Sequence, residues 1–97
     1  MIIVAGRLRV AADERERYLS AVADVAVSAR GAPGCLDFVQ AAEPLDPERI
    51  NVFERWDSDQ DLQCFRTSGD PDATEPDVPP LLGADVHKYR IASVEEP

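Results

Sequence analysis

Hydrophobic and polar positions alternate with a period of two at the start of the chain, in the stretch "IIVAGRLRV". Ile2, Val4 and Leu8 fall on one side of this stretch, while both of its arginines fall on the other. An extended chain directs successive side chains to opposite faces, so the pattern predicts a strand over residues 2–10. Both sides carry apolar residues, which predicts that both faces of this strand are covered.

The next segment changes to helical spacing, with apolar residues recurring every three or four positions from 13 to 30. Asp13 and Glu16 have the spacing of a capping box at its start, and Gly31 follows its end. We therefore predict an amphipathic helix over residues 13–30, with Arg15 directed toward water.

Two further strands are predicted after the turn at Pro33 and Gly34. The first covers residues 35–42, and alternation resumes in "INVFERW", which ends at Trp56. The intervening "EPLDPER" contains two prolines, which cannot donate to a sheet ladder. The pattern predicts a hairpin with a long tip over residues 36–56.

A second capping box, Ser58 with Asp61, predicts a shorter helix that ends near residue 67, with Leu62 and Phe65 as its apolar stripe. Residues 69–83 are rich in proline and aspartate and lack periodicity, which predicts a loop that is either a surface segment or a cover for a site. Alternation over residues 85–94 predicts the last strand.

The order strand, helix, strand, strand, helix, strand is that of the α+β ferredoxin-like fold, βαββαβ, with a four-stranded antiparallel sheet and two helices on one face. Two helices cover only one face of such a sheet. Because the opposite face also carries apolar side chains, we expect a second copy of the chain to cover it in a homodimer.

Composition and charge restrict the function. The chain has 97 residues, which is one domain, and 19 acidic against 10 basic residues give a net charge of −9. This charge repels nucleic acid and anionic membranes, and no segment has the length of a membrane span or signal peptide, so we expect a cytoplasmic protein. Cys35 and Cys64 lack metal-site or redox spacing and are expected to be buried free thiols, with no bound metal.

A candidate catalytic side chain, Glu54, lies close in sequence to Trp56, the only tryptophan of the chain. Glu54 and Trp56 lie on the same side of the predicted strand, together with Val52. A buried carboxyl beside an indole could move a proton. The alternative is structural, with Trp56 as a core anchor and Glu54 paired with an arginine such as Arg7 or Arg90 to fix the dimer.

The stretches "PGCLDF" and "FERWDSDQDLQCFRTS" resemble the antibiotic biosynthesis monooxygenase (ABM) family of the dimeric α+β barrel superfamily. The likeness extends over nearly the whole chain and includes the spacing of Leu62 and Ser68. Many members carry a histidine where this chain has Phe65, and haem-degrading relatives carry an asparagine where it has Gly6. Both departures argue against haem, so we expect no cofactor.

The resemblance implies a cofactor-independent monooxygenase that oxidises a hydroxylated aromatic or quinol-type molecule in an apolar pocket. Trp56, Glu54, His87 and Tyr89 are the predicted catalytic residues. Val4, Gly6, Val52 and Phe65 are the predicted pocket wall, with Gly6 leaving space beside Trp56. For His87, the alternative is a solvated or packed imidazole. Two alternative functions are a dimeric ligand-binding or accessory protein and a polyketide cyclase-like or isomerase-like enzyme.

Overall fold

The computed structural model describes residues 1–68 and 78–97. In chain order the elements are β1 (Ile2–Arg9), the 3₁₀ turn η1 (Ala12–Glu14), α1 (Arg15–Arg30), β2 (Cys35–Ala42), β3 (Arg49–Trp56), α2 (Asp59–Thr67) and β4 (Gly83–Arg90). This confirms the predicted order of strands and helices. Most of the predicted 69–83 loop, including its proposed role as a cover, lies outside the described residues.

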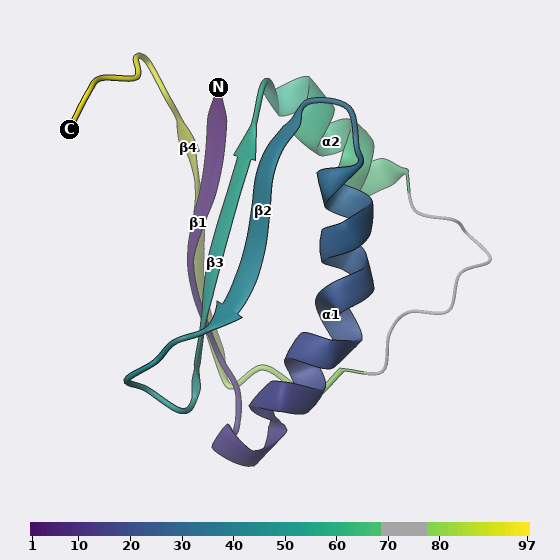
Figure 1. Cartoon of the computed structure of the whole chain (residues 1–97), viewed down its shortest axis with the longest axis vertical. Coiled ribbons are helices and arrows are strands. Elements are labelled where there is room, and N and C mark those ends of the chain that lie inside the picture. The colour runs from purple at the N-terminus through teal and green to yellow at the C-terminus, as the bar shows by residue number, and fades with distance from the viewer. Residues whose placement is uncertain (69–77) are drawn as a thin grey trace.

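The four strands form one antiparallel sheet in the order β2-β3-β1-β4. Figure 1 shows both helices on the same side of this sheet. The arrangement is the predicted ferredoxin-like α+β fold. We call the side beneath α1 and α2 the helix face and the other side the open face.

The register decides which side chains share a face. Val4 of β1 lies opposite Glu54 of β3 on one side and Lys88 of β4 on the other. Directly opposite residues in an antiparallel sheet point to the same face. Because Val4 and Glu54 are both buried, this row belongs to the helix face.

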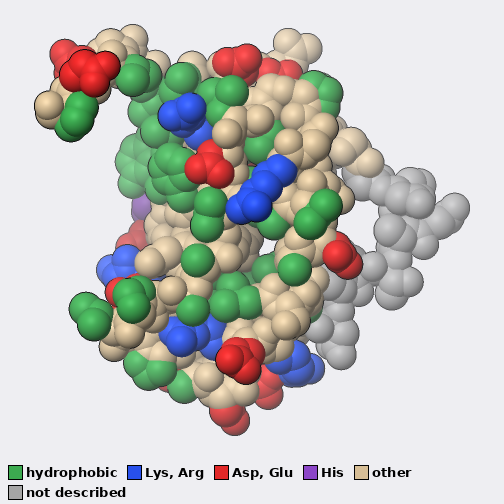
Figure 2. Space-filling view, viewed as in Figure 1, with side chains coloured by type: hydrophobic (Ala, Val, Ile, Leu, Met, Phe, Trp, Pro, Cys, Tyr) green, Lys and Arg blue, Asp and Glu red, His purple; other side chains and the backbone are tan. Residues whose placement is uncertain are grey.

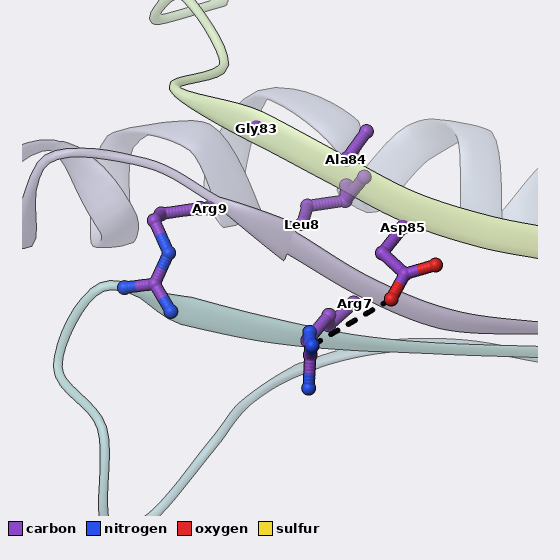
Figure 3. Close-up of a pocket in the computed structure, with 6 residues that line it drawn as sticks. All are labelled: Arg7, Leu8, Arg9, Gly83, Ala84 and Asp85. Carbon is purple, nitrogen blue, oxygen red and sulfur yellow. Dashed lines mark ion pairs between the residues drawn. The ribbon is translucent and has the colours of Figure 1, made fainter.

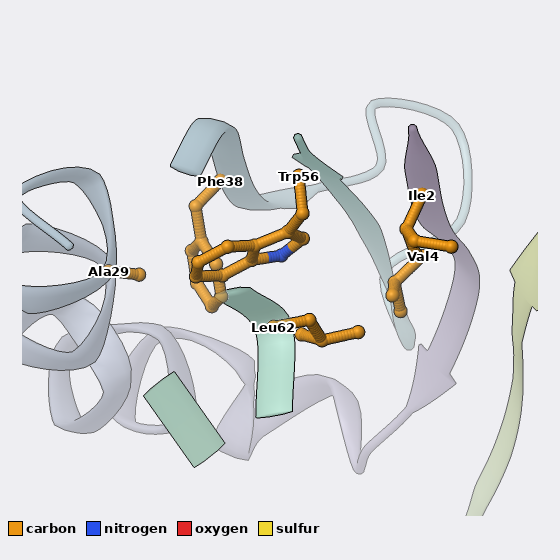
Figure 4. Close-up of a cluster of buried hydrophobic side chains, with 6 residues drawn as sticks. All are labelled: Ile2, Val4, Ala29, Phe38, Trp56 and Leu62. Carbon is orange, nitrogen blue, oxygen red and sulfur yellow. The ribbon is translucent and has the colours of Figure 1, made fainter. Parts of the chain in front are cut away.

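The helix face holds two clusters of buried apolar side chains, and Val86 of β4 packs against both. One cluster, shown in Figure 4, surrounds the indole of Trp56 and consists of Ile2, Val4, Ala29, Phe38, Trp56 and Leu62. The other consists of Leu8, Val10, Tyr18, Ile50 and Val52. The core therefore lies between the sheet and the helices.

The start of the first helix differs from the prediction. Asp13 lies inside the 3₁₀ turn, and Glu14 is the N-cap residue without a side-chain capping bond. Arg15 is not directed into water, because its Nη1 donates to the carbonyl oxygens of Glu43, Asp46 and Arg49 at 3.1, 2.8 and 3.3 Å. This long-range contact ties α1 to the tip of the β2–β3 hairpin and outweighs the local capping preference.

The second helix begins as predicted, since the Ser58 Oγ accepts a hydrogen bond from the Asp61 backbone N–H at 3.1 Å. The last strand is shorter than the predicted 85–94. It ends at Arg90 because Ile2, the residue opposite Arg90, is the first residue of its partner β1. No helix in the described part of the chain is long and apolar enough to cross a membrane, and the cytoplasmic location stays a prediction.

Candidate functional site

The sheet separates the predicted site residues into two groups. Trp56, Glu54, Val52 and Val4 are buried on the helix face. His87 lies opposite Ala5 and Tyr89 lies opposite Ile3, out of phase with the buried residues of β1, so both belong to the open face. The predicted set of four catalytic residues therefore does not converge on one place.

Trp56 is fully buried where β3 ends, at 0% exposure. Its Nε1 donates a hydrogen bond to Oε1 of Glu54 at 3.1 Å. The indole N–H is thus used inside the protein, and its predicted role of binding a substrate oxygen stays a prediction. Trp56 fixes the position of the Glu54 carboxyl group.

Glu54 is a carboxyl group held in an apolar layer, with 9% of the residue exposed. Burial raises its pKa, while the hydrogen bond from Trp56 and the charge of Arg66 act in the opposite direction. Neither Arg7 nor Arg90 pairs with it, because they pair with Asp85 and Asp59 respectively. The arginine pair predicted for Glu54 was a contact that fixes the dimer, so it stays a prediction.

Aromatic rings surround this carboxyl–indole pair. The Phe65 ring of α2 packs on Trp56 with centroids 5.4 Å apart and meets the Phe38 ring edge-on at 6.2 Å. Phe38 lies directly opposite Glu54 across β2 and β3. We call the region bounded by these four residues, together with Val4 and Val52, the interlayer site. It is a desolvated aromatic setting with one acidic group.

Gly6 is needed for a different reason from the one predicted. It lies opposite Val52 and Val86 rather than beside Trp56. A Cβ at Gly6 would meet the backbone of Asp85 and the Cα of Val86 at 2.7 Å, and its φ of +155° is rarely adopted by other residues. The glycine permits β4 to approach β1, and the space is filled by backbone rather than left for a ligand.

The open face has a separate hollow of about 340 Å³. Its lining includes Arg7, Asp85, His87 and Tyr89. Nε2 of His87 lies 2.8 Å from Asp85 Oδ1, and the other Asp85 oxygen is 3.6 Å from Arg7 Nη2. The side chains of His87, Asp85 and Arg7 are all more than half exposed, so this is a solvated charge cluster rather than a desolvated site.

A neighbouring hollow at the end of β1 and β4 is shown in Figure 3. It is lined by Arg7, Leu8, Arg9, Gly83, Ala84 and Asp85. Arg7 is paired with Asp85, and Arg9 binds Glu48 and Asp46 of the hairpin tip at 3.1 and 3.4 Å. These arginines already have partners within the chain, which makes the hollow a weaker candidate than the interlayer site.

The structure also adds two residues that the sequence analysis did not select. Gln40 of β2 lies opposite Val52 on the helix face, and its Oε1 is buried without a hydrogen-bond partner. Cys35 lies opposite Trp56, and burial and the nearby Glu54 charge raise its pKa. Gln40 was detectable in principle, because it is in phase with the buried Phe38 along β2. Cys64 is exposed rather than buried as predicted, and neither cysteine is in a disulfide.

No group of three or more potential metal ligands occurs within residues 1–68 and 78–97. In the interlayer site the position facing Trp56 is occupied by a phenyl ring rather than an imidazole. Its one acidic side chain is Glu54, and the adjacent Cys35 thiol has a raised pKa. The arrangement suits proton transfer in an apolar environment more than metal ligation.

Comparison with known proteins gives a consistent picture. The family model for antibiotic biosynthesis monooxygenase matches residues 1–74. A candidate antibiotic biosynthesis monooxygenase from Deinococcus radiodurans has a TM-score of 0.78 and 18% identity, covering 100% of this chain and 98% of that chain. A similar candidate from Nitrosomonas europaea has a TM-score of 0.75 and 15% identity, covering 96% of this chain and 100% of that chain.

The haem degrader MhuD from Mycobacterium tuberculosis, solved with two haems in its active site, has a TM-score of 0.66 and 16% identity. That match covers 99% of this chain and 100% of MhuD. No curated protein sequence gives a significant match. At these identities the solved structures show a shared fold, whereas the family model matches most of the sequence itself. The chain therefore belongs to the antibiotic biosynthesis monooxygenase family.

Proposed function

We propose that the protein is a cofactor-independent monooxygenase that oxidises a hydroxylated aromatic or quinol-type small molecule in the interlayer site. The observation that carries the proposal is the buried Glu54 carboxyl, whose pKa is raised and whose position is fixed by the indole of Trp56. An acid–base group works best when its pKa is close to the pH of the reaction. A raised pKa therefore makes the Glu54 carboxyl better suited to proton transfer near neutral pH. Family membership supports the reaction class.

The substrate supplies the electrons in this reaction. Glu54 takes a proton from an activated C–H or O–H group, and the resulting anion transfers one electron to oxygen before the C–O bond forms. When the substrate carbon begins as CH₂, the second C–H proton leaves as the O–O bond breaks. One oxygen atom becomes the carbonyl oxygen and the other leaves as water, so O₂ accepts the four electrons that the carbon loses. The apolar setting of Phe65 and Phe38 excludes water from the charged intermediate.

Haem does not fit the residues of this site. Phe65 has no ligating atom, and its ring packs directly against Trp56. The histidine of the chain, His87, belongs to the open face. The raised pKa of Cys35 disfavours the thiolate that would bind iron. These features support the expectation that no haem takes part.

The separation of His87 and Tyr89 from Trp56 favours a second candidate function. With Glu54 as the acidic group of the interlayer site, the protein would bind a small aromatic ligand without oxidising it. A cyclase-like or isomerase-like reaction that needs a single proton-transfer group is compatible with the same geometry.

We also propose that the open face joins two copies of the chain. Phe53 and Tyr89 are 38% and 49% exposed there, next to the partly buried Ile3, Ala5 and Val39. No helix covers this face within the described residues (Figure 1). A two-fold partner would bury these apolar side chains and place the His87 hollow at the interface. Sedimentation equilibrium should show a dimer that Phe53→Lys dissociates, whereas a monomeric wild type would refute the interface.

The test of the reaction is oxygen uptake by metal-free protein with anthrone-type and naphthoquinol substrates. We expect uptake above the autoxidation rate, and a loss of at least about a hundredfold in Glu54→Gln, which keeps an acceptor for Trp56 but cannot accept the proton. Glu16→Gln on the exposed side of α1 is the matched control.

Three results would change the conclusion. Full activity in Glu54→Gln would remove Glu54 from the reaction. Loss of activity in His87→Ala would move the site to the open face. Ligand binding without oxygen uptake would favour the binding function over the monooxygenase.

A further inference from the structure

The open face of the sheet carries an excess of positive charge in an acidic protein. The chain as a whole has a net charge of −9. The charged side chains that the four strands direct to the open face are Arg7, Arg9, Arg49, Arg55, Asp37 and Asp85. Figure 2 shows acidic side chains along α1 and on the C-terminal tail instead. The charge of this face therefore favours an anionic ligand.

Three of the arginines lie together at one end of the open face. Arg9 lies directly opposite Arg49 across β1 and β3, and Arg7 is two residues from Arg9 along β1. Figure 3 shows the Arg7 and Arg9 side chains on the same side of β1. Like charges at directly opposite positions destabilise an antiparallel sheet. This arrangement therefore costs stability unless anions neutralise it.

The carboxylates of the chain neutralise these arginines unequally. Arg9 binds two carboxylates of the hairpin tip, whereas Arg7 Nη2 lies 3.6 Å from Asp85, beyond the range of a hydrogen bond. Arg49 Nε donates to the Asn51 Oδ1 at 2.7 Å. Among residues 1–68 and 78–97, no carboxylate forms an ion pair with Arg49 and its Nη atoms donate no side-chain hydrogen bond. These Nη atoms are donors that a bound anion can use.

The hollow of about 340 Å³ on the open face brings these donors together. Its lining includes Arg7, Arg49, Asp85, His87 and Tyr89. Arg7 and Arg49 are diagonal neighbours on β1 and β3, so their backbones are about 7–8 Å apart and their long side chains can reach one ligand. Two guanidinium groups outnumber the single carboxylate, whose oxygens face Arg7 and His87. The lining therefore has a net positive charge.

We propose that this hollow binds a phosphate group, with the Nη atoms of Arg49 as its main donors and Arg7 as the second cation. The planar guanidinium matches phosphate oxygens with two parallel N–H donors. The hollow is larger than a bare phosphate ion, so the group can be free or carried by a small organic molecule that lies against Tyr89. In the proposed dimer, the bound anion would separate the arginines of the two copies.

The test is titration calorimetry with inorganic phosphate, at an ionic strength held constant with potassium chloride. The variant is Arg49→Met. Its matched control is Arg55→Met, which removes the same charge from the same strand and face but lies outside the hollow. We expect the control to bind phosphate like wild type and Arg49→Met to bind it at least about tenfold more weakly. Arg7→Met should also bind more weakly than the control.

Three results would overturn the proposal. They are equal affinity in Arg49→Met and wild type, an equal loss in Arg49→Met and Arg55→Met, and a wild type without saturable binding. If Arg49→Met does not fold, Arg49→Lys keeps the charge but loses the planar fork, and it should still weaken binding.

A second titration, with phenyl phosphate, distinguishes the two sources of the group. Tighter binding of phenyl phosphate than of inorganic phosphate would support an organic phosphate ester, and equal binding would support the free ion. Neither titration involves Glu54 or oxygen. A failure of the phosphate site therefore leaves the proposed monooxygenase reaction standing, and the absence of oxygen uptake would leave the phosphate site standing.

Discussion

The hydrogen bond between Trp56 and Glu54 can be tested by removing each partner in turn. Trp56→Phe removes the donor and part of the buried ring, and Glu54→Leu removes the carboxyl acceptor. Both side chains are buried, at 0% and 9% exposure, so water cannot readily replace the lost partner. Each single variant therefore leaves one polar group unsatisfied, whereas the double variant removes both.

The expected magnitudes follow from these contacts. Stranding a buried polar group costs about 1–3 kcal/mol, and the smaller ring of Trp56→Phe adds a loss of about 1 kcal/mol of apolar burial. We expect Trp56→Phe to lower the free energy of unfolding by about 2–4 kcal/mol. The double variant should be less destabilised than the sum of the two single variants by about 1–2 kcal/mol.

The same cycle predicts a pH dependence for Glu54. Burial raises its folded-state pKa above the unfolded value, so the folded protein binds more protons in the interval between the two values. Stability then falls as pH rises through that interval. Glu54→Leu lacks this penalty, so its stability relative to wild type should improve as pH increases from about 4 toward 7.

Urea unfolding followed by far-ultraviolet circular dichroism is the suitable assay, because Trp56→Phe removes the only tryptophan. Protein concentration must be equal in all four samples, since association with a second copy would change apparent stability. Additivity of the two substitutions within about 0.5 kcal/mol would refute the proposed bond. A relative stability of Glu54→Leu that does not change with pH would refute the reasoning about its pKa.

Three further predictions concern contacts between the strands and helices that surround the site. Gly6→Ala should lower the melting temperature and cost about 1–3 kcal/mol because the new Cβ meets the β4 backbone, whereas Gly83→Ala, with 3.9 Å of room, should be tolerated. In urea unfolding, Arg15→Met should lower the free energy of unfolding by about 1–2 kcal/mol, because Arg15 donates hydrogen bonds to three carbonyl oxygens of the hairpin. The exposed Arg17→Met should lower it less. Hydrogen bonds from Lys88 and Arg90 lower the pKa of Asp59 from 3.8 to about 2, so the ionised carboxylate stabilises the fold. As pH falls from about 4 to 2 this contribution is lost, and thermal melts should show wild type losing stability relative to Asp59→Asn.

The sequence predicted the elements well where a local signal was strong. Ser58 and Asp61 mark the start of α2 because their capping bond lies within four consecutive residues. The limits of β2 were predicted correctly, since the turn at Gly34 with its φ of +81° is also a local feature. Asp13 shows the opposite case, because the contact of Arg15 with a distant hairpin determines how α1 begins.

The candidate site could be predicted only in part. The period of two placed Glu54 and Trp56 on one side of a strand, which the buried pair confirms. It did not show that the indole donates to that carboxyl, because such a bond depends on side-chain conformations fixed by the packing of Phe65 and Phe38. Alternation within β4 also could not show which of its two sides lies beneath the helices.

The sequence by itself determined the order of strands and helices, because periodicity, caps and turns are encoded in neighbouring residues. The family followed from the likeness of its motifs around Trp56 and from the family-model match over residues 1–74. Only the tertiary structure decided that His87 and Tyr89 lie on the opposite face from Trp56, since this depends on the register between β1 and β4. It also decided that the Oε1 atom of Gln40 is buried without a partner, because burial results from the packing of distant segments. Local interactions therefore determined the elements, and long-range pairing determined which side chains can act together.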